Sequence, residues 1–342
     1  MLQFNAPVTE IIRQRFSCRS YRREPIDADR LERLQAFIVD LPPAPFDRLR
    51  TAPFDTVRAV PRSRRTRDAG SGTSTPVRDG RLTCAYGTGA GRTTPFGARP
   101  RFGLVAATQT DGRSLRGLGT YGFIKNPPAF ILGAMTPSDY DLEDYGYLME
   151  AIILFATSLD LGTCWLGGTF TKSSFARKMN LSAAETMPAV TSVGEYADPE
   201  QKRKGLVSRT AGADRRLPWE KLFFNFMLDV PLIRNEAAEY ATALEMVRLG
   251  PSASNKQPWR IVNYNQFWRF YLRRTPGYRS DPIKRILDLC DLQRLDMGIA
   301  MCHFELAARE LGLKGGWAIE EELDKYPDAL TEYVVSWDSR DG

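Results

Sequence analysis

Three polar residues alternate near the start of the chain, in the segment RQRFSCRSYRREPI. If this segment is extended, Arg15, Ser17 and Arg19 project to one side, because successive side chains of a strand point to opposite faces. Two guanidinium groups and a hydroxyl on one face match the oxygens of a phosphate. The segment therefore predicts an anion site, and a plain solvated surface is the alternative.

A second candidate for ligand binding is the loop PSASNKQPW at residues 251–259. It places Ser252, Ser254, Asn255 and Gln257 between two prolines, just before a β-rich run. Such residues are common in ordinary turns, because their short polar side chains bond to the backbone nearby. They are equally suited to hold a polar ligand, and both interpretations stay open for this loop taken alone.

The elements that must position these residues form an internal repeat. Two apolar helical stretches, 145–165 and 297–317, are predicted to be buried helices that stop near a glycine. At an offset of 152 residues they share Gly146/Gly298, Leu154/Leu306, Ala156/Ala308, Leu159/Leu311, Leu161/Leu313 and Trp165/Trp317. Upstream, LPPAPF followed by GARPRFGLV aligns without gaps with LGPSASNKQPWRIV once residues 47–96 are removed. The repeat predicts two related halves.

The predicted fold is α+β, with mixed or antiparallel sheets, long buried helices, and the two halves packed as a pseudo-twofold dimer. The halves are residues 1–200 and 218–342, joined by a charged linker at 201–217. Residues 47–96 hold ten arginines and four aspartates, which account for the net charge of +6. We expect this low-complexity, Arg-rich insert to be extruded and disordered. The alternative is an arm that binds nucleic acid or an acidic partner.

Each half keeps chemistry that the other lacks. An offset of 208 residues sets Phe223, Asn225 and Met227 against the Arg-Ser-Arg segment, and these residues cannot bind a phosphate. In the other direction, the polar loop residues Ser252, Ser254 and Asn255 stand opposite Ala44, Phe46 and Gly97. The sequence therefore predicts one composite pocket between the halves and one degenerate counterpart.

These motifs, together with LGTCWLGGTF at 161–170, resemble the signatures of the FMN-dependent nitroreductase superfamily. The resemblance is to its single-chain members, in which one polypeptide resembles the usual homodimer, and it covers most of the chain outside 47–96. Its most specific element is the S-x-N-x-Q-P-W spelling of the loop. It implies FMN between the halves, with the N-terminal motif on the phosphate side and the P-S-x-x-N loop supplied by the opposite half.

The resemblance implies further cofactor-binding residues. Gly167 and Gly168 match the place where the backbone approaches the isoalloxazine edge, which a glycine permits because it has no Cβ. Lys125 resembles the basic residue near the flavin pyrimidine, where a cation stabilises charge that develops on reduction. Arg215 and Arg216 resemble basic residues that add to the phosphate site. A strand-end turn, an exposed lysine and a solvated linker are the respective alternatives.

The implied activity is hydride transfer from NAD(P)H to the flavin and then, in a ping-pong sequence, to a small aromatic, quinone or nitro acceptor. No side chain is expected to be catalytic, because the chemistry takes place on the flavin. Cys164 and His303 are expected to be packing residues. The alternative function is a non-catalytic relic of the fold that binds flavin, another ligand or nothing.

The rest of the composition narrows the class of protein. No apolar run reaches eighteen residues, the N-terminus lacks a signal-peptide pattern, and the five cysteines are scattered. With a single histidine, a histidine-based metal site is not expected. We expect a cytoplasmic protein without a membrane or nucleic-acid partner, and a monomer, because one chain resembles the family dimer.

Overall fold

The structure is a computed structural model that describes residues 2–51, 97–107, 114–198, 216–278, 290–320 and 329–340. The first half contains α1 Val8–Gln14, α2 Ala28–Val39, α3 Pro45–Thr51, β1 Arg101–Ala106, β2 Ala129–Ala134, α4 Asp141–Ser158, β3 Gly162–Leu166, α5 Lys172–Lys178 and β4 Val190–Gly194. The second half contains η3 Trp219–Lys221, β5 Phe223–Asn225, η4 Arg234–Tyr240, α7 Ala241–Leu249, η5 Ala253–Asn255, β6 Trp259–Tyr264, β7 Phe267–Arg273, α9 Leu292–Glu310, β8 Gly316–Ala318 and β9 Thr331–Asp338. None of the described helices combines the length and the apolar character needed to cross a membrane.

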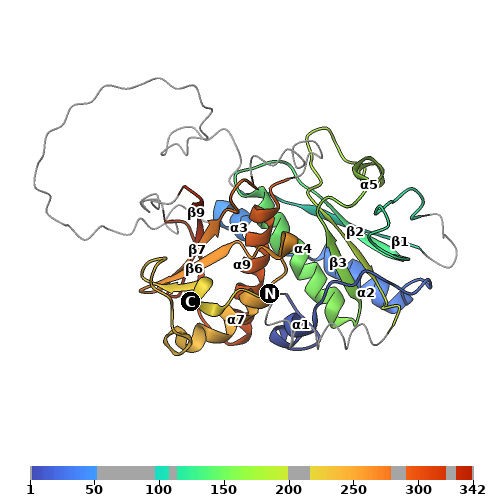
Figure 1. The fold of residues 1–342 in the computed structure, drawn as a ribbon. Coiled ribbons are helices and arrows are strands. Elements are labelled where there is room, and N and C mark those ends of the chain that lie inside the picture. The colour runs from blue at the N-terminus through green and yellow to red at the C-terminus, as the bar shows by residue number, and fades with distance from the viewer. Residues whose placement is uncertain are drawn as a thin grey trace, which may run out of the picture.

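Two long helices, α4 and α9, pack against each other at the centre of the molecule, between the two sheets (Figure 1). They meet at glycines, where the backbones come too close for a side chain. A Cβ on Gly146 would lie 2.2 Å from the carbonyl oxygen of Leu295, and a Cβ on Gly298 would lie 2.0 Å from that of Glu143. Gly298 is the repeat equivalent of Gly146, and Leu295 is the equivalent of Glu143, so the contact is reciprocal. The two predicted buried helices are confirmed.

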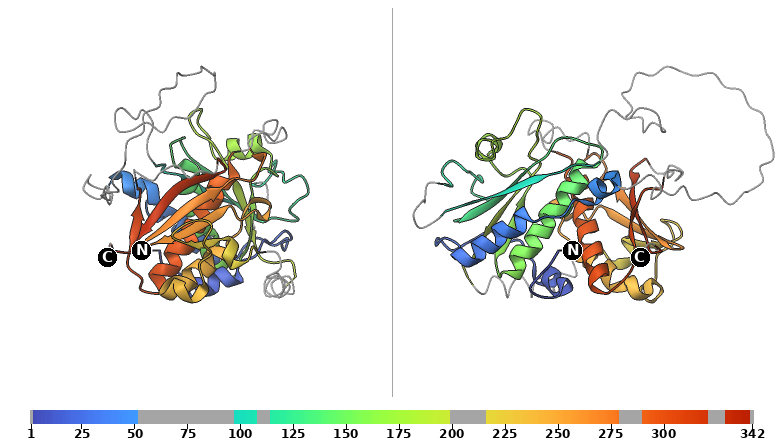
Figure 2. Two further views of the ribbon diagram at one scale, coloured as in Figure 1. Left: turned by 60° about the vertical axis from the view of Figure 1, so that its left-hand side comes forward. Right: turned by 180° about the vertical axis from the view of Figure 1, so that it is seen from behind.

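The two sheets share one order of strands. The first runs β1-β2-β4-β3, and the second runs β5-β6-β7-β9-β8. Strand β5 is the addition in the second sheet, and it makes that sheet mixed because it pairs in parallel with β6, whereas the other strand pairs are antiparallel. The two sheets lie on opposite sides of the central helices (Figure 2). The predicted α+β class with mixed and antiparallel sheets is confirmed.

The residues that the sequence alignment joins across the insert are neighbours in space. The backbone N–H groups of Phe46 and Ala98 both donate to the carboxylate of Asp144, at 2.9 and 3.0 Å. In the second half the equivalent Asp296 accepts from the N–H of Ala253 at 3.0 Å. An aspartate in the first two turns of each central helix therefore fastens the preceding loop.

The folded region extends a short way into the segment predicted as an insert. Asp47 is buried and accepts from Arg99 at 2.8 Å, and Arg48 pairs with Glu305 at 2.9 Å. Helix α3 continues to Thr51. The predicted disorder of the remainder, residues 52–96, lies outside the described residues.

A hydrophobic cluster is shared between the two halves. Helix α1 buries Val8, Ile11 and Ile12 in a cluster that also contains Leu244 of α7 and Met301 of α9. The predicted boundaries at 200 and 218 stay a prediction, since residues 199–215 lie outside the described part of the chain.

Candidate functional site

The N-terminal Arg-Ser-Arg segment is extended and runs along the edge of the first sheet. Helix α1 ends at Gln14, and Ser17 then pairs in parallel with Thr163 of β3. Arg15 is only 4% exposed, whereas Ser17 and Arg19 are exposed. The extended conformation is as predicted, but the three side chains are not equally presented, because the segment passes from the interior to the surface.

Arg15 is buried without satisfying its donors. Its Nε atom lies 3.6 Å from Oε1 of Glu150, within ion-pair range, and has no hydrogen-bond partner among the described residues. Burial lowers the pKa of Arg15, and the nearby Glu150 opposes that shift. A buried guanidinium with an unpaired donor is uncommon and calls for an acceptor. Arg15 therefore has donor capacity left for an anionic ligand.

The polar loop is held in shape by its own side chains. Ser252 accepts from the backbone N–H of Gln257 at 2.9 Å, and the buried Gln257 amide accepts from the N–H of Leu217 at 2.8 Å. Ser254, Asn255 and Gln257 all have positive φ, a conformation that side-chain hydrogen bonds help to stabilise. Ser254 and Asn255 are exposed at the tip, while Gln257 shapes the loop from within.

Arg216 connects this loop to the N-terminal segment. Its guanidinium donates to the carbonyls of Leu249, at 2.9 Å, and Gly250, and to Oδ1 of Asn255 at 3.2 Å. Burial, followed by repulsion from Arg15 and Arg248, lowers the pKa of Arg216 to about 10. Arg15 and Arg216 therefore lie close enough to repel each other, and an anion bound between them would relieve that repulsion.

Lys125 lies beside the exposed end of the Arg-Ser-Arg segment. Its backbone N–H donates to the carbonyl of Arg19 at 2.8 Å, and its carbonyl accepts from Tyr21 at 3.0 Å. The Arg19 guanidinium lies over the Phe123 ring, 4.4 Å from the centroid, and the Lys125 side chain is exposed. Two further cations therefore stand at the outer end of the segment that begins with Arg15.

Gly167 and Gly168 follow β3 directly and are half-buried. A Cβ on Gly167 would lie 2.8 Å from the side chain of Leu292, the first residue of α9. The glycine thus has a packing role at the start of α9 in addition to the predicted approach of a cofactor ring. Arg215 lies outside the described residues.

One equivalence drawn from the sequence is wrong. Ser17 lies at the β3 edge of the first sheet, whereas Asn225 pairs with Asn263 of β6, at the opposite edge of the second sheet. A constant offset cannot detect this change, because backbone pairing and not sequence decides which edge an extended segment joins. In the first-half loop that the sequence predicts to be the degenerate counterpart of the 250–257 loop, the protein's own side chains pack together. Phe46 is fully buried and stacks on Tyr140 with ring centroids 4.1 Å apart.

The structure adds residues that the sequence reading missed. Glu150 of α4 is fully buried and contacts Arg15, His303 and Trp165. The available signal was a glutamate inside the apolar run LMEAIILFA, because a charge on a buried helix needs partners. His303 is fully buried with two hydrogen bonds, which confirms that it is a packed core residue.

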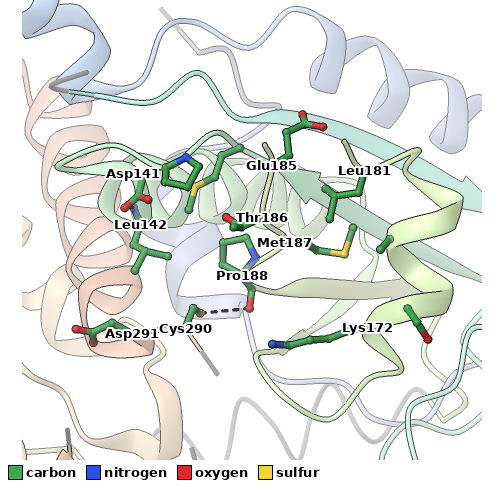
Figure 3. A pocket seen from close by; sticks show the side chains of 14 residues that line it. Asp141, Leu142, Lys172, Leu181, Glu185, Thr186, Met187, Pro188, Cys290 and Asp291 are labelled. Carbon is green, nitrogen blue, oxygen red and sulfur yellow. Dashed lines mark hydrogen bonds between the residues drawn. The ribbon is translucent and has the colours of Figure 1, made fainter. Parts of the chain in front are cut away.

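A pocket of about 530 Å³, separate from the cluster around Arg15, lies beside α5 and the start of α9 (Figure 3). It is lined by Leu142, Lys172, Met187, Pro188 and Cys290, among others, and by none of the predicted cofactor-binding residues. Its carboxylates have cationic partners: Asp141 pairs with Arg294, Glu185 with Arg101, and Asp291 with Arg274. The pocket therefore offers little unpaired charge to a ligand, unlike the cluster around Arg15.

Residues 104–308 match the family model described as "Putative TM nitroreductase". Among solved structures, a "putative nitroreductase" from Thermotoga maritima MSB8 is 17% identical, covers 98% of this chain and 95% of its own, and has a TM-score of 0.49. A nitroreductase family protein from Clostridium difficile 630 is 15% identical over 61% of this chain and 92% of its own, with a TM-score of 0.37. A nitroreductase with bound FMN from Bacteroides fragilis NCTC 9343 is 16% identical over 57% and 91%, with a TM-score of 0.32. A comparison with curated proteins gave no match.

Proposed function

Because this chain belongs to the nitroreductase family whose model matches residues 104–308, we propose that it is an FMN-dependent NAD(P)H oxidoreductase. The observation that carries the proposal is the buried Arg15, whose Nε has no hydrogen-bond partner in the described part of the chain and whose charge repels Arg216. This arrangement suits a dianionic phosphate, such as that of FMN, bound between segments that lie more than two hundred residues apart.

The chain's own residues would bind and orient the cofactor. Arg15 would donate to the phosphate from inside the protein, with Ser17 and Arg19 nearer to solvent. The loop tip at Ser254 and Asn255 would contact the cofactor from the second half, while Arg216 and Gln257 hold that loop in place. The β3 end at Gly167 and Gly168 would face the ring, and Lys125 would add positive charge at the edge of the site.

When bound, FMN would supply the redox chemistry, accepting a hydride from NAD(P)H and passing it to a small aromatic, quinone or nitro acceptor in a ping-pong sequence. We also propose that the protein is a cytoplasmic monomer, because the two halves of one chain would supply both sides of the cofactor site. Arg215 is proposed to add to the phosphate side.

The test is a spectrum followed by a reduction. Purified full-length protein, reconstituted with FMN and gel-filtered, is expected to retain a flavin absorbance between roughly 350 and 500 nm, as a tightly held cofactor would. Anaerobic NADH or NADPH should bleach this band, and a nitroaromatic or a quinone should restore it. Parallel lines in a double-reciprocal plot would support the ping-pong sequence.

Two results would overturn the proposal in different ways. Protein that retains no FMN would have no flavin-dependent activity, and salt-sensitive binding of nucleic acid would then favour the arginine-rich segment as the functional part. Protein that retains FMN but is reduced by neither nicotinamide would be a non-catalytic flavin binder.

A further inference from the structure

The carboxylate of Glu150 links the proposed phosphate side of the site to the core of the protein. Its Oε2 atom accepts from the indole N–H of Trp165 at 2.7 Å. Its Oε1 atom lies 2.9 Å from Nε2 of His303 and 3.6 Å from Nε of Arg15. Glu150 and His303 are both fully buried, so water cannot substitute for any of these contacts.

The hydrogen-bond partners of the two His303 ring nitrogens indicate where the hydrogens lie between His303 and Glu150. Nδ1 of His303 is 2.8 Å from the carbonyl oxygen of Met246, which can only accept, so Nδ1 carries a hydrogen. The contact between Nε2 and Glu150 then requires a second proton. Burial raises the pKa of the Glu150 carboxyl, but the His303 hydrogen bond and the Arg15 charge outweigh it and leave that pKa below its ordinary value. The geometry therefore places a shared proton between Nε2 of His303 and Oε1 of Glu150, and the Glu150 side chain lies between His303 and the Arg15 guanidinium.

We propose that Glu150 is the positioning residue of the cofactor site, and that it fixes the Arg15 guanidinium so that the site prefers a phosphorylated flavin. This inference rests on the proposed function, since it names the internal support for the phosphate-binding arginine. Attraction across 3.6 Å holds the guanidinium in place, and Glu150 does not saturate it, because Nε makes no hydrogen bond to any residue that the structure describes. The same carboxylate fixes Trp165, two residues before Gly167, on the ring side.

Glu150→Gln tests the hold on Arg15. The glutamine keeps the size of the side chain and an amide oxygen, but it removes the carboxylate charge that lies 3.6 Å from Nε of Arg15. Loss of a negative charge by itself favours an anionic ligand, so weaker FMN binding would indicate a loss of orientation.

The chain contains a matched control in Glu305. It is a buried glutamate of α9 that accepts from the indole of Trp317 at 2.7 Å and from the hydroxyl of Tyr147 at 2.9 Å, and it pairs with Arg48. Trp317 stands opposite Trp165 in the internal repeat, yet no partner of Glu305 belongs to the proposed cofactor site. Glu305→Gln therefore reports the cost of disturbing a buried glutamate without touching Arg15.

The experiment measures dissociation constants for FMN and for riboflavin, which lacks the phosphate, in full-length wild-type protein and in the Glu150→Gln and Glu305→Gln variants. We expect Glu150→Gln to weaken FMN about tenfold or more while riboflavin changes less than about threefold, because one charge-assisted hydrogen bond is at stake. Glu305→Gln should leave the FMN to riboflavin ratio unchanged. In an Arg15→Ala background, Glu150→Gln should have no further effect on FMN.

Each other outcome has a definite meaning. Equal losses of FMN and riboflavin, an unchanged ratio, or tighter FMN binding in Glu150→Gln would overturn the positioning role while leaving the proposed function standing. Wild-type protein that binds neither flavin would overturn both. If Glu150→Gln does not fold, Glu150→Asp keeps the charge but withdraws it by one methylene, and it should show an intermediate loss of phosphate preference; an unchanged ratio in that variant counts against the proposal.

Discussion

At the scale of single residues, the proposed phosphate site depends on Arg15, Arg19 and Asn255. We predict that Arg15→Ala, Arg19→Ala and Asn255→Ala each weaken FMN binding, with Arg15→Ala costing about tenfold or more because its buried Nε has no hydrogen-bond partner among the described residues. Flavin fluorescence titration measures the effect. The controls are Arg33→Ala, which removes an equal charge from an exposed position of helix α2, and Met227→Ala, also at an exposed position. Equal losses at all five positions would contradict a single site.

A second prediction at this scale concerns the pH dependence of stability. Burial, opposed by the N–H groups of Phe46 and Ala98, raises the pKa of Asp144 to about 8. The folded protein then binds this proton more tightly than the unfolded chain, whose pKa is about 3.9. The contribution of this proton to the free energy of unfolding is fully present below the unfolded pKa. It is lost as pH rises towards 8, by at most about 1.4 kcal/mol per pH unit.

Asp144→Asn stays neutral at every pH, so its free energy of unfolding should vary less between pH 5 and 8 than that of the wild type. Urea titrations at several pH values measure the slope. Asp29→Asn, whose side chain is 74% exposed, should keep the wild-type slope. Identical slopes in all three proteins would show that Asp144 is ionised throughout.

At the scale of elements, the crossing of α4 and α9 sets the distance between the halves. Gly146→Ala would place a Cβ 2.2 Å from the backbone oxygen of Leu295, which cannot move without displacing α9. We predict a loss of about 2 kcal/mol or more in the free energy of unfolding, or no folded protein. Gly316→Ala, where the new Cβ would meet no described residue within 4 Å, should stay within about 0.5 kcal/mol of the wild type. Similar melting temperatures for both variants would refute the close contact.

The same crossing explains how elements of both halves reach one site. Glu150 lies on α4 one turn beyond Gly146, and His303 lies on α9 beyond Gly298. The close approach lets the two side chains meet at 2.9 Å, and the N-terminal segment brings Arg15 to the same point. The proposed site is therefore supported by packed helices, while the residues proposed to contact the cofactor lie on the N-terminal segment, at the end of β3 and on the 250–257 loop.

At the scale of the whole molecule, the fold should tolerate loss of most of the insert. We predict that replacing residues 52–96 with a short Gly-Ser linker leaves the melting temperature and the FMN content close to the wild type, because Asp144 already holds both flanks. Deleting 47–96 instead removes Asp47 and Arg48, takes one of two arginine partners from the buried carboxylate of Glu305, and should lower stability. Loss of FMN from the shorter deletion would show that the insert contributes to the site.

The asymmetry between the two loops also predicts the cofactor stoichiometry. At the first-half position equivalent to the 250–257 loop, the buried Phe46 ring stacks on Tyr140. We therefore predict one FMN per chain, measured as the ratio of flavin absorbance to protein concentration after gel filtration. Two flavins per chain would contradict a degenerate second position.

The sequence by itself determined the α+β class, the two buried helices and the pairing of loops across the insert. Each of these follows from local periodicity or from the gapless match of LPPAPF and GARPRFGLV with LGPSASNKQPWRIV, which can be read from the order of residues alone. It also singled out Arg15 and Asn255 as candidates, because guanidinium and amide groups in those short patterns already suggest a polar ligand.

Only the tertiary structure decided which groups meet. In the structure Arg15 is buried beside Glu150, and Arg216 donates to the loop carbonyls. Asn225, the predicted counterpart of Ser17, lies at the other edge of its sheet. Periodicity assigns a side chain to a face, but ion pairs and strand partners depend on distances between segments far apart in the chain. Glu150 lies in the middle of an apolar helix, and its proposed role depends on contacts with Arg15, His303 and Trp165, which no local sequence pattern connects to it.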